Sequence, residues 1–201
     1  VEQWISTHSL EFHDAKIIKN EVNMGVSVNC NNAWKNVKTE WVKSIGGDDL
    51  LLDNCITQNV NFVKMNSNCF ILASKMEWFG RISKITPEYC DFAFFNLEPL
   101  EQFRYLRFNS FNFAPSVFMK RELLEEVGYA DIKYRNLEDL PLWLKITRSG
   151  YKIYFLNEIT VKYRISDSIS KHSSRYVNLS FLKDLIDIDS QFKFHEMRKV
   201  S

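Results

Sequence analysis

Strand-like and helix-like segments alternate along most of this chain, and this alternation restricts its fold more than any other feature of the sequence. Short, β-branched or alternating segments predict strands at residues 16–21, 40–45, 69–74, 151–156 and 159–164. Segments with apolar residues at helical spacing predict helices at residues 31–40, 53–66, 99–108, 120–127 and 137–150. Helices placed between strands favour the α/β class, with a mixed, mostly parallel sheet flanked by helices.

Several helix boundaries carry their own signals. Pro141 stands in the first turn of the 137–150 segment, and Gly150 follows its last turn. Gly128 is placed to end the 120–127 helix, and Pro99 to begin the 99–108 helix. Asp53 is a candidate N-cap for the 53–66 helix.

The composition excludes several functional classes. The 201 residues suit one globular domain, and the 26 basic residues nearly balance the 25 acidic ones, so no nucleic-acid partner is expected. The four cysteines form no CxxC pair, which argues against a zinc site or a disulfide framework. No apolar run reaches the roughly 18 residues of a membrane-spanning helix. We therefore expect a cytoplasmic protein, either free or peripheral to the inner face of the membrane.

Two carboxylates, Asp48 and Asp49, follow the 40–45 strand and the pair Gly46–Gly47. If this strand is an inner one, they lie at its carboxyl end, where α/β sheets bind ligands. In extended backbone, adjacent side chains point in opposite directions, so the two should do different work. One could bind a hard divalent cation while the other contacts a hydroxyl group or a water molecule. The alternative is a solvated turn.

A second acidic pair, Glu138 and Asp139, comes just before Pro141. These residues should lie at the positive end of a helix dipole, which would keep a carboxylate ionised and able to accept a proton. The pair therefore fits a general base. The alternative is that both residues only cap the helix.

Three segments in order resemble the family-two glycosyltransferases, particularly bacterial enzymes of surface polysaccharide synthesis. The first is "NEVNMGVSVNCNNAWKNVKTEWVKSIGGDDLLLDN", similar to the family's stretch that leads to a strand ending in Asp-Asp. The second is "FNFAPSVFMKRELLEEVGYAD", and the third is "LEDLPLWLKITRSGYKIYFLNEITVKYRISDSIS". Together they cover roughly residues 20 to 170 and imply a GT-A-like fold.

The resemblance implies a role for each candidate residue. Asp49 would bind Mn²⁺ or Mg²⁺. Asp139 would be the catalytic base of a single inverting displacement, with Glu138 supporting it or binding the acceptor. His172 is a second candidate metal ligand, or a solvated bystander, since the sequence has Ser166 and Asp167 where family members often have a His. The residues implied to bind the nucleotide-sugar donor are Asp48, Asn29, Gly25 and Arg164.

The family's chain normally opens with a strand, a helix and a second strand that hold the nucleotide base, so we expect this sequence to lack that N-terminal portion. We assign residues 1–172 to the glycosyltransferase domain and 173–201 to a helical extension that packs on it or on a partner. The expected partners are a UDP-sugar donor and a saccharide acceptor, and a homodimer is a candidate assembly. Two rival functions stay open: a non-catalytic glycan- or partner-binding domain, and a metal-dependent phosphohydrolase.

Overall fold

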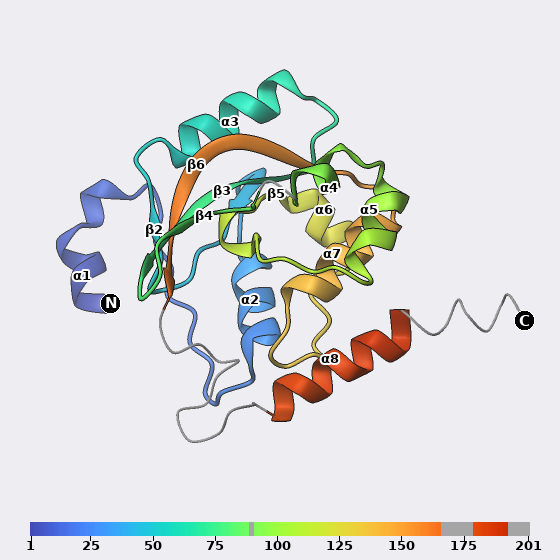
Figure 1. Ribbon diagram of the computed structural model, residues 1–201. Helices are drawn as coiled ribbons and strands as arrows, with labels where there is room; N and C mark the ends of the chain where they lie inside the picture. The colour runs from blue at the N-terminus through green and yellow to red at the C-terminus, as the bar shows by residue number, and fades with distance from the viewer. Residues whose placement is uncertain (89–90, 166–178, 193–201) are drawn as a thin grey trace, which may run out of the picture.

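The computed structural model describes residues 1–88, 91–165 and 179–192, and Figure 1 shows a curled sheet with helices on both sides. The strands are β1 (Trp41–Lys43), β2 (Leu50–Leu51), β3 (Ile71–Gly80), β4 (Lys84–Thr86), β5 (Phe118–Lys120) and β6 (Ile153–Ile165). The helices are α1 (Glu2–Thr7), α2 (Val26–Trp34), α3 (Cys55–Met65), α4 (Phe92–Asn96), α5 (Pro99–Leu106), α6 (Arg121–Glu126), α7 (Asp139–Arg148) and α8 (Leu179–Phe192). Single 3₁₀ turns lie at Ser9–Glu11 and Ala114–Ser116.

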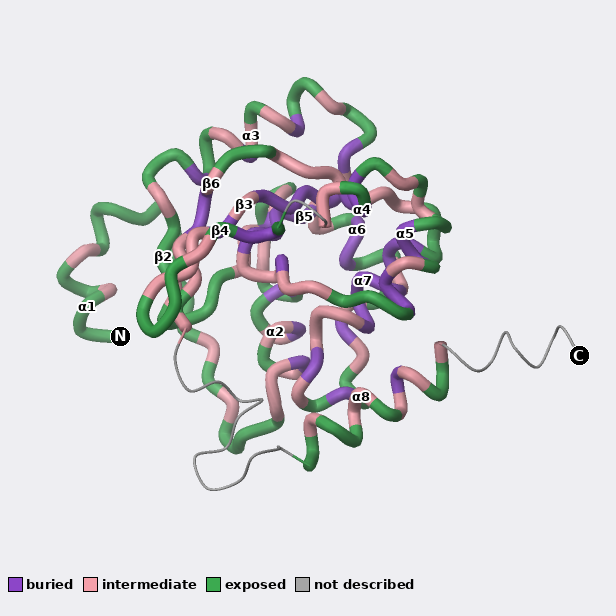
Figure 2. Tube along the Cα trace, viewed as in Figure 1, coloured by how far each residue is buried: buried purple, intermediate pink, exposed green. Residues whose placement is uncertain are grey.

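The sheet is mixed, which confirms the predicted α/β class. Its strand order is β1-β5-β3-β6-β2, and β4 pairs with β3 outside this order. The parallel part is the long pairing of β3 with β6, in register from Ile71–Ile153 to Gly80–Ile165 with an irregularity near Lys75. The pairings β1–β5, β2–β6, β3–β4 and β3–β5 are antiparallel. β3 and β6 therefore form the centre of the sheet, as Figure 2 shows by the burial of β3.

The main core lies between the sheet and the helices α4, α5, α6 and α7. Aromatic rings fill much of it, and those in mutual contact are Phe94, Phe95, Phe111, Phe113, Trp143 and Phe155. Gln102 of α5 is fully buried among them. Its amide donates hydrogen bonds to the carbonyl oxygens of Phe94 and Ile153, and its carbonyl accepts the N–H of Ile153 at 2.8 Å. This side chain therefore fastens α5 to the start of β6.

Helix α2 packs against the segment that leads into α7. Asn31 exchanges two hydrogen bonds with the backbone of Ala130, and Ser27 donates to the carbonyl oxygen of Tyr134. Gly25, which precedes the helix with φ 90°, approaches Arg135 so closely that a Cβ atom there would lie 2.6 Å from the Arg135 carbonyl oxygen. Only glycine tolerates both this angle and this contact.

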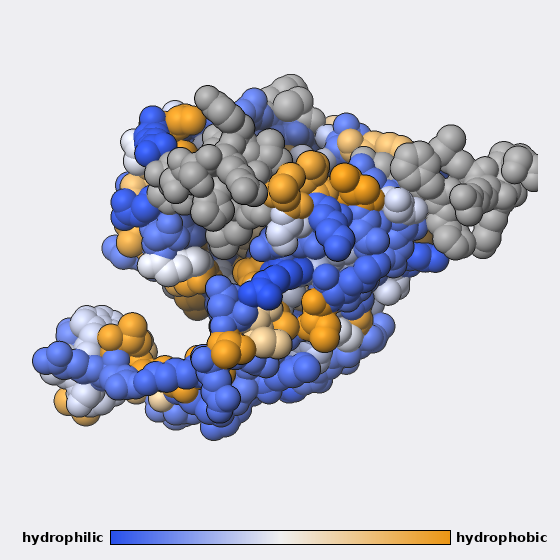
Figure 3. Space-filling view, turned by 90° about the horizontal axis from the view of Figure 1, so that it is seen from below, coloured by the Kyte–Doolittle hydropathy of each residue, from blue (hydrophilic) through white to orange (hydrophobic). Residues whose placement is uncertain are grey.

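Helix α8 crosses the lower side of the molecule in Figure 1 and contacts α5, α7 and the loop before α7. Ile188 is buried, the ring of Phe192 packs edge-on to Phe103, and Tyr134 donates a hydrogen bond to Gln191 at 2.6 Å. On the face seen in Figure 3, hydrophobic residues form separate small patches among hydrophilic ones, and α1 stands apart from the body. Within the described ranges, no helix has the length and apolar character needed to cross a bilayer.

Some local predictions were wrong. Residues 16–21 form no strand, because Ile17 is exposed and the flanking lysines bond to polar side chains outside the sheet. The segments 151–156 and 159–164 belong to one strand, β6, in which Asn157 and Glu158 continue the strand. Strand β1 lies at an end of the strand order rather than inside it.

Two helices also differ from the prediction. Helix α2 begins at Val26 and ends at Trp34 instead of spanning residues 31–40. In α3 the N-cap is Asn54 rather than Asp53, and Ile56 is exposed. The inner face of α3 is formed by Cys55, Asn59 and Val63.

Candidate functional site

The pair Asp48–Asp49 lies in a tight turn between β1 and β2, and not in extended backbone. The N–H of Asp49 donates to the carbonyl oxygen of Gly46 at 3.3 Å. A Cβ atom on Gly46 would lie 2.8 Å from Oδ2 of Asp49 and 3.4 Å from Oδ1 of Asp48. Both carboxylates therefore turn toward one point beside Gly46. The expectation that they point in opposite directions was wrong, because the turn at Gly47 and Asp48 removes the alternation of a strand.

The end of β6 holds this turn in place. The backbone N–H of Arg164 donates to Oδ1 of Asp49 at 2.9 Å, and Nε of Arg164 donates to the carbonyl oxygen of Asp48 at 2.9 Å. The guanidinium group also lies 4.4 Å from the centre of the Phe79 ring. The structure thus brings Arg164 together with Asp48 and Asp49. Arg164 holds the turn with its backbone N–H, which bonds to the Asp49 side chain, and with its Nε, which bonds to the Asp48 backbone.

The chemistry of the two carboxylates fits a hard divalent cation. Burial raises the pKa of Asp49, and the neighbouring Asp48 raises it further, against the lowering effect of the Arg164 N–H. A cation at the point that both carboxylates face would offset the burial of the Asp49 charge and its repulsion from Asp48. Carboxylate oxygens are the ligands that Mg²⁺ and Mn²⁺ prefer. Magnesium commonly takes only one or two protein carboxylates and completes its shell with phosphate oxygens and water.

Further protein ligands do not appear in the part of the chain that the structure describes. There, no group of three or more His, Cys, Asp or Glu side chains is placed to hold a metal ion. His172, the second candidate ligand, lies outside the described residues.

The pair Glu138–Asp139 occupies the start of α7, where Glu138 is the N-cap and Asp139 the first helical residue. Burial raises the pKa of Glu138 to about 7, and the charge of Asp139 adds to this. Burial also raises the pKa of Asp139, against the lowering effect of the Leu140 N–H, which donates to its Oδ1 at 2.7 Å.

The helix dipole was expected to keep this pair ionised, and that expectation was wrong. A dipole contributes about 0.3–1 kcal/mol at a helix end. The rise of the Glu138 pKa from 4.5 to about 7 corresponds to a larger opposing free energy, about 3 kcal/mol before any allowance for solvent. Burial therefore outweighs the helix dipole and raises the pKa of Glu138 toward neutral pH, where a general base is most effective.

Tyr163 of β6 lies within range of charges from both acidic pairs. Its pKa is raised by burial first, then by the charges of Asp49, Asp48 and Asp139. Asn112 hydrogen-bonds to the Tyr163 side chain, and Trp78 packs edge-on against its ring. Because the charges of Asp49 and of Asp139 both act on this one phenol, the fold brings the two acidic pairs into the same region.

The remaining predicted donor residues lie near the start of α2. Asn29 is exposed and accepts a hydrogen bond from the Asn20 amide at 3.0 Å, and Gly25 contacts Arg135. Cys30, in the same helix, feels the charges of Glu138 and Asp139, and burial raises its pKa to about 12. The described contacts of Gly25 thus connect it to the segment that leads into the second acidic pair.

Two residues of this region have contacts that sequence reasoning missed. Lys43 donates to the carbonyl oxygens of Pro115 and Val117, and burial lowers its pKa to about 8 while Asp49 acts in the opposite direction. Tyr163 lies in the third segment that resembles the family, but it was not among the predicted site residues. Its position one residue before Arg164 is visible in the sequence. To infer from this that Tyr163 lies near the acidic pairs, the register of β6 must also be known.

Comparison with known proteins now identifies the family. Residues 1–128 match the model of glycosyl transferase family 2. An uncharacterized glycosyltransferase of Methanocaldococcus jannaschii, MJ1057, is 23% identical over 154 residues, which cover 74% of this chain and 50% of that protein.

Solved structures of S. aureus TarS 1-349 have the same fold. The complex with UDP-GlcNAc superposes with a TM-score of 0.67 at 18% identity, over 93% of this chain and 52% of that one. The complex with UDP gives a TM-score of 0.66 at 16% identity, over 93% and 49%. The chain thus spans about half the length of these relatives, and the predicted GT-A fold is confirmed. Because the family model covers well over half of its residues, this chain belongs to glycosyl transferase family 2.

Proposed function

We propose that this chain transfers a sugar from a UDP-sugar donor to a saccharide acceptor, with inversion at the anomeric carbon, in the assembly of a surface polysaccharide. One observation carries the proposal: charges of two acidic pairs, from distant parts of the sequence, act on the same tyrosine. The family membership and the UDP and UDP-GlcNAc complexes of the TarS fold relative support it.

Asp139 acts as the base in this proposal. Of the second pair, its charge acts on Tyr163, the neighbour of the Arg164 that holds the Asp48–Asp49 turn. It takes the proton of the acceptor hydroxyl as that oxygen attacks the anomeric carbon and the bond to the donor diphosphate breaks. Glu138, whose pKa burial and then the charge of Asp139 raise to about 7, supports it.

Asp49 and Asp48 would hold Mn²⁺ or Mg²⁺ beside Gly46. When bound, the ion supplies Lewis-acid stabilisation of charge on the leaving diphosphate. Arg164 keeps both carboxylates in their turn through its two bonds to residues 48 and 49. Gly46 leaves the space that these oxygens need.

The decisive experiment compares UDP binding with and without Mn²⁺ by calorimetry. Mn²⁺ should strengthen UDP binding, and Asp49→Ala should remove that gain. Asp53→Ala is the matched control, because Asp53 is an exposed aspartate four residues further on. An unchanged metal dependence in Asp49→Ala would refute the metal assignment.

The base is tested by Asp139→Asn, which keeps the shape of the side chain and cannot take a proton. Transfer from UDP-GlcNAc should be lost while UDP binding is kept. Release of phosphate without any acceptor would indicate the phosphohydrolase alternative instead, and UDP release that needs no added acceptor would contradict sugar transfer as the main reaction.

A further inference from the structure

The segment between α6 and α7, residues 127–138, forms no helix or strand. Backbone N–H and C=O groups that lie away from water in such a segment need partners from elsewhere in the chain. On one side α2 supplies them, with hydrogen bonds to the backbone of Ala130, Tyr134 and Arg135. The bond to Arg135, from the N–H of Val26 to the carbonyl oxygen, is 2.9 Å long. This side of the segment is thus fixed to α2.

Helix α8 holds the segment from the other side. One oxygen of Asp184, Oδ2, accepts the backbone N–H of Asn136 at 3.0 Å and its side-chain Nδ2 at 3.1 Å. The same Nδ2 donates to Oγ of Ser180 at 2.9 Å. Hydrogen bonds to an ionised carboxylate are about twice as strong as those between neutral groups. Asn136 comes two residues before Glu138, so α8 fixes the chain just before the second acidic pair.

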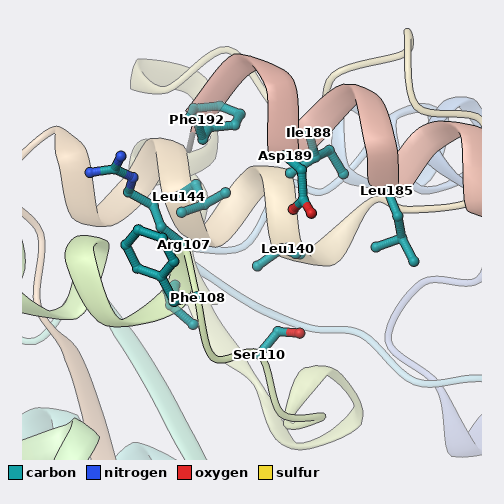
Figure 4. A pocket seen from close by; sticks show the side chains of 10 residues that line it. Arg107, Phe108, Ser110, Leu140, Leu144, Leu185, Ile188, Asp189 and Phe192 are labelled. Atoms are coloured by element: carbon teal, nitrogen blue, oxygen red, sulfur yellow. The ribbon is translucent and has the colours of Figure 1, made fainter. Parts of the chain in front are cut away.

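The same helix also contacts the chain just after that pair. The N–H of Leu140 donates to Oδ1 of Asp139 at 2.7 Å. The side chain of Leu140 lines a cavity of about 230 Å³ between α7 and α8, together with Leu185 and Ile188 of α8 (Figure 4). Side chains around an open space make fewer contacts than those in a filled core. The apolar contact of α8 with α7 is therefore incomplete, which leaves the bonds to Asn136 a large share in holding the two together.

We infer that Asp184 is a positioning residue for the proposed base. It holds Asn136 against α8 and thereby keeps the first turn of α7, which carries Asp139, in one place relative to the substrates. The inference rests on the proposed function, because it takes Asp139 as the base. It adds to that function a requirement for α8, which acts through the 127–138 segment and not on the reacting atoms.

Native-state hydrogen exchange followed by NMR tests the positioning directly, in the full chain without donor or metal. Asp184→Ala should speed exchange of the Leu140 amide at least about tenfold, because the first turn of α7 then opens more often. Amides of α3, which lies across the sheet from α8 in Figure 1, should keep their rates. Asp184→Asn retains an oxygen that can accept both bonds, so its Leu140 amide should stay within about threefold of the original rate.

Two more variants locate the contact. Lys183→Ala is the matched control, because Lys183 is the exposed neighbour of Asp184 on α8, and the Leu140 amide should not respond to it. Asn136→Ala removes the two side-chain bonds and keeps the backbone one, so it should speed the Leu140 amide less than Asp184→Ala does. Asn136→Ala also tests the contact from the other side if Asp184→Ala does not fold.

Kinetics test the link to catalysis. With UDP-GlcNAc as the donor and methyl β-glucoside as the acceptor, Asp184→Ala should lower kcat about tenfold, because the base is misplaced. The KM for UDP-GlcNAc should change less than about twofold, since the bonds that hold the Asp48–Asp49 turn come from Arg164 of β6. Asp184→Asn should recover most of the lost kcat.

The outcomes separate this inference from the proposed function. An unchanged Leu140 amide in Asp184→Ala overturns the inference, even if sugar transfer is observed. Equal acceleration in α3 overturns it as well, because Asp184 would then contribute only to general stability. A raised KM with an unchanged kcat also overturns it. Local acceleration that Asp184→Asn reverses supports the positioning of the acidic pair by α8, even if the original chain transfers no sugar and the proposed function fails.

Discussion

Replacing Glu138 by Gln should make the protein more stable at alkaline pH, although it removes a residue of the proposed catalytic site. Burial and Asp139 raise the pKa of Glu138 from 4.5 to about 7, so the folded protein holds this proton more tightly than the unfolded chain does. Well below pH 4.5 the carboxyl is protonated in both the folded and the unfolded state, so it does not change the free energy of unfolding. As the pH rises from 4.5 to above 7, ionisation in the folded state becomes increasingly unfavourable, and stability falls.

The size of this stability change follows from the rise in the pKa of Glu138. A shift of this size corresponds to about 3 kcal/mol. Glu138 keeps part of its surface accessible and interacts with Asp139, so solvent screening reduces the expected value to about 1–2 kcal/mol. The side chain makes no capping hydrogen bond, so the amide removes the charge without removing a cap.

Urea denaturation at pH 4 and pH 8 measures this prediction. The Glu138→Gln variant and the original chain should have similar free energies of unfolding at pH 4, and the variant should gain about 1–2 kcal/mol at pH 8. Glu158→Gln, an exposed carboxylate of β6, is the control and should stay within about 0.5 kcal/mol at both pH values. A Glu138→Gln variant that is less stable at pH 8, or whose effect is equal at both pH values, would refute the reasoning.

Three further variants test other parts of the structure. Tyr163→Phe removes the hydroxyl on which charges of both acidic pairs act, and it should lower the transfer rate from UDP-GlcNAc about 10- to 100-fold with the fold intact. Tyr154→Phe, in the same strand but packed against Phe62, should leave that rate unchanged. Gln102→Met leaves the N–H and carbonyl groups of Ile153 without their partner and should cost about 3 kcal/mol in urea denaturation, against less than about 0.5 kcal/mol for the exposed Arg104→Met. Gly25→Ala, at φ 90° and against Arg135, should cost at least about 2 kcal/mol, while Gly47→Ala, with open space around it, should be nearly neutral; equal costs would contradict the packing argument.

The parts of the fold that could be predicted are those whose signals are local. Helix α5 begins at Pro99 and α7 contains Pro141 in its first turn, as proposed, because proline fixes the backbone without needing its neighbours. Gly128 and Gly150 follow their helices at positive φ, which glycine alone adopts freely. The two acidic pairs could also be found in the sequence, because adjacent Asp or Glu residues next to the end of a predicted strand or helix are easy to recognise there.

What could not be predicted depends on distant contacts. A strand at residues 16–21 has suitable residues, but pairing depends on which sheet edge is near, and Ile17 ends up exposed. The inner face of α3 includes the polar Asn59 while Ile56 is exposed, so apolar spacing alone does not identify that face. The pKa of Glu138 depends on how deeply α7 is packed, and the position of Tyr163 depends on the register of β6 with β3.

The parallel pairing of β3 and β6 also determines when the site can form during synthesis. Its two strands are separated by more than 70 residues, so the chain must close a long loop before any of these backbone bonds exists. The turn at Asp48 and Asp49 is made early but receives its two bonds from Arg164 only after β6 has left the ribosome and paired. A nascent chain that stops before residue 153 would therefore carry the aspartates without the geometry that lets them act together, and folding of the site should be among the last events in this protein.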